Sequence, residues 1–128
     1  MRIGIGVIGT GVMGAEHARI LRRETPGAHL AGIFDADAAR AQAVAAGAAV
    51  FSNPHSLIAS DQIDAIVIAS PDATHAALTL ACIEAGKPVL CEKPLASSAA
   101  DALNVVQAEV ALGRRLIQVG YMRRFDPG

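Results

Sequence analysis

Residues 3–14 decide how this chain folds, and they read Ile-Gly-Ile-Gly-Val-Ile-Gly-Thr-Gly-Val-Met-Gly. An apolar run over residues 3–8 ends at Gly9, and three glycines then follow the spacing G-x-G-x-x-G: Gly9, Gly11 and Gly14. The residues behind the motif have the apolar pattern of a helix. A strand, a glycine turn and a helix in this order are the context in which the motif predicts a dinucleotide site.

Each glycine of the turn has a separate predicted task. Gly9 allows a tight turn, Gly11 lets a pyrophosphate approach the backbone, and Gly14 lets the helix pack closely on the strand. The first N–H groups of the helix have no partner within it, and its positive dipole end suits a diphosphate. The predicted cofactor contacts of this stretch are Gly9, Thr10, Gly11, Val12, Met13 and Gly14.

The length of the chain is typical of a single domain. The chain has 128 residues and a formal net charge of −1, with 11 basic and 12 acidic residues, so it has no electrostatic footprint for nucleic acid. It has no apolar run of about 18 residues that would cross a membrane. It has no leader with a cleavage site, so we expect a cytoplasmic protein. Cys82 and Cys91 lack metal-ligand spacing, and we expect buried thiols and no metal site.

Strand and helix patterns alternate along the whole chain. The expected strands are residues 3–8, 29–34, 48–51, 64–69, 88–91 and 116–119. The expected helices are residues 12–23, 37–46, 53–58, 73–85 and 98–112. This alternation predicts a Rossmann fold, a doubly wound α/β architecture with helices on both faces of a six-stranded parallel sheet in the order 3-2-1-4-5-6.

An acidic residue follows the second expected strand. Asp35 stands 21 residues after Gly14, near the position at which this motif places a ribose-binding carboxylate. Such a carboxylate accepts hydrogen bonds from the ribose hydroxyls and repels a 2′-phosphate, so the pattern favours NAD over NADP. The alternative is that Asp35 and Asp37 only cap the next helix, and Asp37 is the better cap. Arg40 has the reach to contact a phosphate, but an arginine on a helix surface is commonly solvated.

A second polar stretch, Ser-Pro-Asp-Ala-Thr-His over residues 70–75, follows the fourth expected strand. This strand neighbours the first one across the switch point, where loops line the ligand crevice. Ser70 and Pro71 are therefore predicted to contact the cofactor. His75 either faces the nicotinamide ribose or is a structural histidine in the first turn of its helix, and the sequence leaves both open.

A third stretch, Cys-Glu-Lys-Pro-Leu over residues 91–95, follows the fifth expected strand. Lys93 would lie on the same rim as the glycine turn, where an amine can exchange a proton with a substrate hydroxyl while hydride moves to or from the cofactor. Pro94 restricts the backbone at Lys93. The alternative is a solvated lysine paired with Glu92, and spacing alone favours it because surface lysines are common.

Together these motifs closely resemble the Gfo/Idh/MocA oxidoreductase family over essentially all 128 residues, and residues 118–126 look most like its inositol 2-dehydrogenase branch. The resemblance implies an NAD-dependent enzyme that acts on a CH–OH group of a polyol or sugar. It implies that Lys93 is catalytic and touches the substrate, that Glu92 and Pro94 flank the nicotinamide, and that the Lys-Pro bond is often cis. It also implies that Arg123 faces the substrate and the cofactor.

The family has a second, substrate-binding domain that residues 1–128 do not include. We therefore expect an isolated domain to bind NAD without full activity. Three hypotheses follow: a truncated NAD-binding part of an inositol 2-dehydrogenase-like enzyme, a stand-alone non-catalytic NAD-binding regulatory module, or an α/β scaffold with a chance glycine motif. The sequence leaves the polyol open, and also whether this chain shares the homo-oligomeric state that the full-length family implies.

Overall fold

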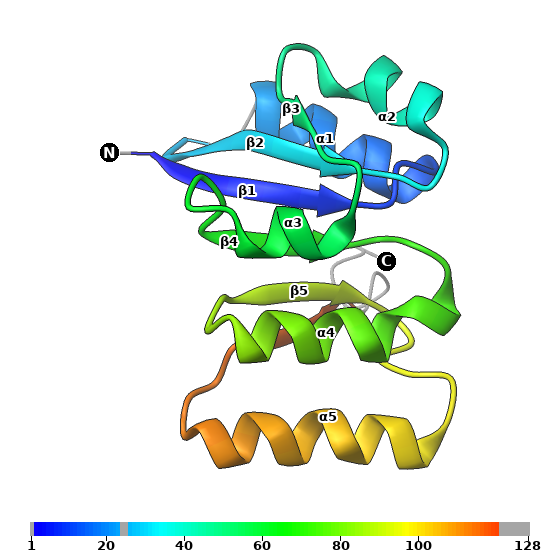
Figure 1. The fold of residues 1–128 in the computed structure, drawn as a ribbon, viewed down its shortest axis with the longest axis vertical. Helices are drawn as coiled ribbons and strands as arrows, with labels where there is room; N and C mark the ends of the chain where they lie inside the picture. The colour runs from blue at the N-terminus through cyan, green and yellow to red at the C-terminus, as the bar shows by residue number, and fades with distance from the viewer. Residues whose placement is uncertain (1, 24–25, 121–128) are drawn as a thin grey trace, which may run out of the picture.

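The β-sheet has the strand order that the sequence predicts. The computed structural model describes residues 2–23 and 26–120, and the strands in this part are β1 (Ile3–Ile8), β2 (Ala28–Phe34), β3 (Ala49–Val50), β4 (Ala65–Ile68), β5 (Val89–Glu92) and β6 (Ile117–Gly120). They form one six-stranded sheet in the order β3-β2-β1-β4-β5-β6, and every adjacent pair is parallel (Figure 1). The predicted fold class and strand order are confirmed.

Helices cover both faces of the sheet. They are α1 (Val12–Arg23), α2 (Ala38–Ala45), α3 (Pro54–Ala59), α4 (His75–Glu84) and α5 (Ala99–Leu112), with a 3-10 turn, η1 (Asp72–Thr74), before α4. Val7 of β1 packs in the core that contains the buried residues of α1 and α2, whereas its neighbour Ile8 packs with α3 and α4. A strand buried on both faces needs apolar residues at successive positions, and β1 has them. α5 packs beside α4 (Figure 1).

Side-chain caps explain where three helices begin. Asp37, Asn53 and Ser98 each accept a hydrogen bond from a backbone N–H in the first turn of α2, α3 and α5. These short polar side chains satisfy donors that have no partner within the helix. The prediction that Asp37 caps the second helix is confirmed.

Several predicted boundaries differ by one residue from the structure, and two elements differ in length or type. The third strand is only Ala49–Val50, because the ladder with β2 involves only two residue pairs. The helix expected over residues 73–85 is divided: residues 72–74 form η1 and the α-helix begins at His75. The tighter turn arises because Thr74 directs both its backbone N–H and its hydroxyl to the Pro71 carbonyl oxygen, at 2.9 and 2.7 Å.

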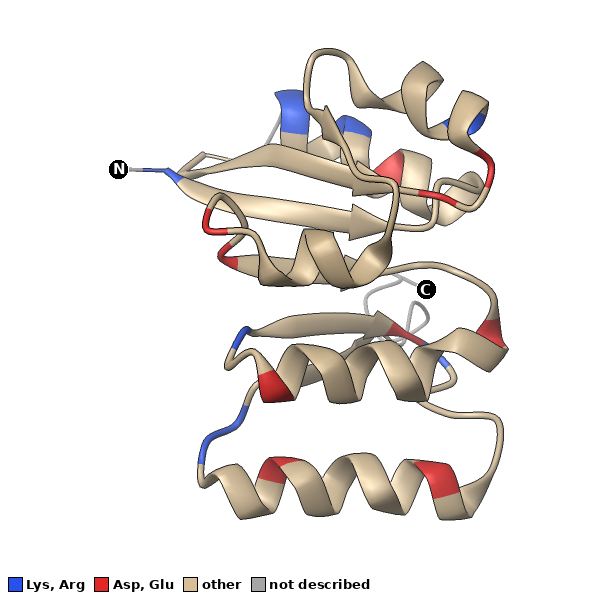
Figure 2. Cartoon of the chain, viewed as in Figure 1, with Lys and Arg blue, Asp and Glu red and all other residues tan. Residues whose placement is uncertain are grey.

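Within residues 2–23 and 26–120, no helix has the length and apolar character needed to span a bilayer. In the described part of the chain, lysine and arginine lie on several separate elements (Figure 2).

Candidate functional site

A wide crevice lies where β1 and β4 meet at their carboxyl ends. It encloses about 850 Å³, and its lining includes the glycine turn, the end of β2 at Asp35, and the loop that holds Ser70 and Pro71. β1 is flanked by β2 and β4, so the strands before and after this point are added to the sheet on opposite sides of β1, although all of them run parallel. Crevices at such a switch point are where open parallel sheets bind their ligands.

The glycine turn leaves space on the side of the crevice and none on the side of the protein. Gly9 has φ of +95°, and a Cβ there would lie 2.5 Å from the Ser70 nitrogen. A Cβ on Gly14 would overlap the Gly9 carbonyl oxygen, whereas a Cβ on Gly11 would meet nothing within 4 Å. The geometry therefore agrees with a tight turn at Gly9, close helix packing at Gly14 and open access at Gly11. The contact of Gly11 with a pyrophosphate stays a prediction.

The three other residues of the motif differ in exposure. Val12 begins α1 and is 88% exposed, which is unusual for a large apolar side chain. Met13 is half-buried, and Thr10 is only 3% exposed. Val12 thus offers an apolar surface next to the turn, whereas the Thr10 side chain is buried and contacts other residues of the protein.

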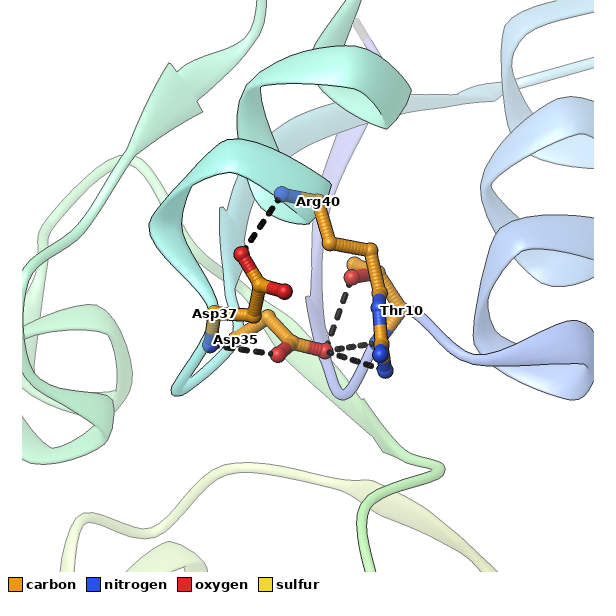
Figure 3. A network of polar contacts seen from close by, with 4 residues as sticks. All are labelled: Thr10, Asp35, Asp37 and Arg40. Carbon is orange, nitrogen blue, oxygen red and sulfur yellow. Dashed lines mark hydrogen bonds and ion pairs between the residues drawn. The ribbon is translucent and has the colours of Figure 1, made fainter.

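Thr10 holds the carboxylate of Asp35 in place. Its backbone N–H and its hydroxyl both donate to Asp35 Oδ2, at 2.7 and 2.8 Å, and the Asp37 N–H donates to Asp35 Oδ1 at 2.8 Å (Figure 3). Arg40 adds a cation whose Nη1 lies 4.0 Å from Asp35 Oδ2. The turn after β1 and the end of β2 are thereby joined, which the motif did not predict for Thr10.

These contacts decide the charge of Asp35. Burial by itself raises the pKa of this carboxyl, but the hydrogen bonds from Asp37 and Thr10, together with the Arg40 cation, outweigh it and hold the pKa below its ordinary value. Asp35 lines the crevice as an ionised, immobilised carboxylate. Asp37 provides the cap of α2, so the alternative that Asp35 serves mainly as that cap loses its basis.

Ser70 and Pro71 line the crevice, with the Ser70 backbone directly beside Gly9. Their contact with the cofactor stays a prediction. His75 is 1% exposed, and its ring nitrogens lie 2.7 Å from the Ser70 carbonyl oxygen and 2.6 Å from the Pro94 carbonyl oxygen. Both nitrogens therefore face backbone carbonyl oxygens inside the protein. This placement favours the structural alternative for His75, and its effect is to tie the loop after β4 to the loop after β5.

The loop after β5 presents Lys93 at a second, smaller cavity. The Lys93–Pro94 bond is cis, as the resemblance implied. Lys93 is exposed and lines a cavity of about 630 Å³ together with Pro94, Ser98 and Val119. The carboxylate of Glu92 is engaged elsewhere, because its Oε1 lies 2.6 Å from His17 Nε2 on α1. Among residues 2–23 and 26–120, no carboxylate forms an ion pair with the Lys93 amine, so the predicted pairing with Glu92 is wrong. The exposure of Lys93 fits the solvated lysine of that alternative, and its catalytic role stays a prediction.

The cysteines lie away from both cavities. Cys82 and Cys91 are free and buried in the core between the sheet and α3 and α4. Burial, and then the neighbouring Cys91, raise the pKa of Cys82 to about 12, and burial also raises the pKa of Cys91. Both remain protonated thiols at neutral pH. The described part of the chain contains no group of three side chains arranged to hold a metal ion.

Arg123, which the resemblance places near the substrate, lies outside the described residues. The structure adds two functional-site contacts that the sequence analysis missed: the Thr10–Asp35 clamp and the His17–Glu92 pair. Thr10 was recognised only as a member of the glycine motif. No local pattern connects residue 17 with residue 92, so only the fold reveals that pair.

Comparison with known proteins gives a consistent result. The model of the oxidoreductase family with an NAD-binding Rossmann fold, Gfo/Idh/MocA, matches residues 3–121. Inositol 2-dehydrogenase 1 of Saccharopolyspora erythraea is 58% identical over 131 residues, which cover 99% of this chain and 39% of that protein. The inositol 2-dehydrogenase of Rubrobacter xylanophilus is 57% identical, over 98% of this chain and 37% of its own length.

Solved structures agree with the sequence relatives. The crystal structure of myo-inositol dehydrogenase from Lactobacillus casei, in complex with NAD(H) and myo-inositol, superposes with a TM-score of 0.95 at 35% identity. The match covers all of this chain and 39% of that one. The chain thus spans about two fifths of the length of the relatives that it matches.

Proposed function

Because this chain belongs to the Gfo/Idh/MocA oxidoreductase family, in which it forms an NAD-binding Rossmann domain, we propose that it is the cofactor-binding part of an inositol 2-dehydrogenase-like enzyme. The proposed reaction moves a hydride between NAD and a CH–OH group of a polyol or sugar, with Lys93 as the acid or base. Because the chain belongs to this family, we reject the hypothesis of an α/β scaffold in which the glycine motif occurs by chance. Two hypotheses remain: part of an enzyme, or a non-catalytic NAD-binding module.

The observation that carries the proposal is the placement of Asp35 and Lys93 on one edge of the sheet. Asp35 follows β2 and Lys93 follows β5, and β1 and β4 with their loops lie between them. A dinucleotide extends across the switch point, with its adenosine half toward β2 and its other half beyond β4. A cofactor bound by Asp35 would therefore bring its nicotinamide toward the loop that carries Lys93.

Different residues are proposed to bind different parts of the cofactor. The Asp35 carboxylate accepts a hydrogen bond from the adenosine ribose, and the first N–H groups of α1 face the pyrophosphate above Gly11. Ser70 and Pro71 form part of the crevice wall next to the glycine turn. His75 holds that wall against the loop of Pro94, which keeps the cofactor wall and the catalytic loop in one arrangement.

The chemical step assigned to this chain is a proton transfer at the Lys93 amine. In the oxidation direction the uncharged amine takes the proton of the substrate hydroxyl, and the C–O bond becomes a carbonyl as the hydride leaves the same carbon. NAD, when bound, supplies the acceptor for that hydride. In the reverse direction the ammonium returns the proton to the carbonyl oxygen. Glu92 and Pro94 would border the nicotinamide on either side of Lys93.

The substrate side of the site is proposed to come from the remainder of a longer enzyme. Arg123 would face the polyol and the cofactor. Efficient hydride transfer requires the substrate to be held in a reactive pose, which is worth roughly 7–11 kcal/mol. We therefore propose that residues 1–128 bind NAD but turn over slowly or not at all by themselves. The cytoplasmic location and the oligomeric state stay predictions.

A chimera tests the proposal. Residues 1–128 would replace the corresponding segment of inositol 2-dehydrogenase 1 from Saccharopolyspora erythraea, and NADH formation with myo-inositol would be followed by absorbance. We expect activity, and we expect Lys93→Met to lower kcat by about 10²–10⁴-fold, the usual contribution of a positioned acid or base. NAD binding by calorimetry should change little in that variant. An inactive chimera that still binds NAD would favour the non-catalytic module.

A further inference from the structure

We infer that Arg40 makes this site tolerant of a second cofactor, NADP, by placing a guanidinium where the 2′-phosphate of its adenosine ribose would lie. The inference rests on the proposed function, because it assumes that the adenosine ribose binds at Asp35. It adds a specificity-determining residue that the glycine motif and Asp35 do not predict, since those two features favour NAD.

The first observation is the direction of the Arg40 side chain. Its backbone N–H donates to Asp37 Oδ1 at 3.2 Å, so Arg40 lies in the first turn of α2. Side chains on a helix point back toward its N-terminus, which here means toward the end of β2. The guanidinium reaches across Asp35 to the turn of Thr10 (Figure 3). The Arg40 side chain is 53% exposed and lines the crevice, so it is accessible to a ligand there.

The second observation is how few acceptor positions Asp35 has left. Thr10 donates twice to Oδ2, and the Asp37 N–H donates to Oδ1. A carboxylate has about four acceptor positions, two on each oxygen, so roughly one remains for a ribose hydroxyl. With one such hydrogen bond at most, the preference for an unphosphorylated ribose depends mainly on the negative charge of Asp35.

The third observation is that this charge is partly offset. The charged side chains that line the crevice are Asp35, Asp37 and Arg40. The Arg40 Nη1 lies 4.0 Å from Asp35 Oδ2, near enough to weaken the repulsion that a phosphate would experience. A guanidinium also binds phosphate oxygens in a bidentate manner. A cation in the first turn of a helix is unfavourable beside the positive dipole end, and a bound anion would relieve that.

Asp35 remains ionised, so NADP is expected to bind more weakly than NAD rather than to replace it. Calorimetry of the 128-residue chain with NAD⁺ and with NADP⁺ tests this. We expect NADP⁺ to bind about tenfold more weakly than NAD⁺, and Arg40→Gln to weaken NADP⁺ about tenfold further, as expected for a lost charge-assisted phosphate contact. The same variant should change NAD⁺ affinity by less than about threefold, because no phosphate contact is lost there.

The matched control is Arg115→Gln. This residue is also exposed and lies just before β6, at the amino end of the sheet and away from the crevice. The Arg115→Gln substitution removes the same charge as Arg40→Gln and should leave the affinities for NAD⁺ and NADP⁺ unchanged. Circular dichroism would verify that each variant is folded.

The outcomes separate the inference from the proposed function. Binding of NAD⁺ without binding of NADP⁺ overturns the role of Arg40 and leaves the NAD site intact. Equal weakening of both cofactors by Arg40→Gln also overturns it, since the arginine would then contact a part that they share. If neither cofactor binds at millimolar concentration, the proposed function fails and the inference fails with it.

Discussion

His17 and Glu92 are 75 positions apart in the chain, yet His17 Nε2 lies 2.6 Å from Glu92 Oε1. The side chains are 24% and 13% exposed, so the contact is partly shielded from water. His17 is on α1, just behind the glycine turn, and Glu92 immediately precedes Lys93. The pair therefore joins the helix that is proposed to face the pyrophosphate to the loop that carries the proposed catalytic amine.

Breaking this pair is expected to destabilise the domain. His17→Ala should lower the free energy of unfolding by about 1–2 kcal/mol, because a hydrogen bond to a carboxylate is lost at a partly buried position. Urea denaturation would measure it, and a double-mutant cycle with Glu92→Gln would isolate the coupling. His55→Ala is the control, since that exposed side chain has no comparable partner among the described contacts. Additive effects of the two single variants would contradict a direct interaction.

The ribose role of Asp35 predicts a change in cofactor preference. Asp35→Ser removes both the acceptor and the charge, so NAD⁺ should bind about tenfold more weakly or worse, and the ratio of NADP⁺ to NAD⁺ affinity should rise. Calorimetry with both cofactors gives the ratio directly. Asp61→Ser, at an exposed carboxylate in a turn, is the charge-matched control. An unchanged ratio in Asp35→Ser would refute the ribose role.

Asp35 should also contribute to the acid sensitivity of the fold. Its pKa in the folded chain is lowered by the net effect of its hydrogen bonds and of Arg40, so the folded form binds fewer protons than the unfolded chain in the acid range. The resulting stability is fully present above the unfolded pKa of about 3.9 and is lost as the pH falls through the lower folded value. In urea denaturation at a series of pH values, Asp35→Asn should show a shallower loss below about pH 4. Parallel curves for the two proteins would contradict this.

Gly11 and Gly14 offer a matched pair that separates folding from binding. Gly14→Ala should destabilise the domain by about 3 kcal/mol or more, because its Cβ would overlap the Gly9 carbonyl oxygen in a rigid turn. Gly11→Ala should change the unfolding free energy by less than about 0.5 kcal/mol, because the space around it is open. It should nevertheless weaken NAD⁺, since the methyl group would stand where the pyrophosphate approaches. Denaturation and calorimetry together give both readings; full NAD⁺ affinity in Gly11→Ala would place the pyrophosphate elsewhere.

Much of the fold follows from local signals in the sequence. The strands, the helices and the order of the sheet were predictable because each strand is a short apolar run and glycine, proline or a capping residue separates it from the next helix. The chirality rule for parallel connections then leaves few topologies. One exception also has a local cause. The 3-10 turn before His75 forms because the Thr74 hydroxyl donates to the Pro71 carbonyl oxygen, and the spacing of apolar residues does not reveal such a contact.

The candidate site was predicted as a set of positions rather than as a set of contacts. The sequence placed Asp35 and Lys93 on one rim by motif spacing and by the rule that parallel strands end at a common edge. It could not show that Thr10 occupies one oxygen of Asp35, that Arg40 lies beside it, or that His75 directs both ring nitrogens to backbone.

By itself, then, the sequence determined the Rossmann architecture, the glycine turn and the position of Asp35 at the end of the second strand, because each depends on patterns within short stretches of the chain. Only the tertiary structure decided which donors bind Asp35 and that His17 pairs with Glu92. The physical reason is range. Backbone propensities and caps act over a few residues, whereas a hydrogen bond between α1 and β5 depends on how the helix packs on the sheet, which no local pattern encodes.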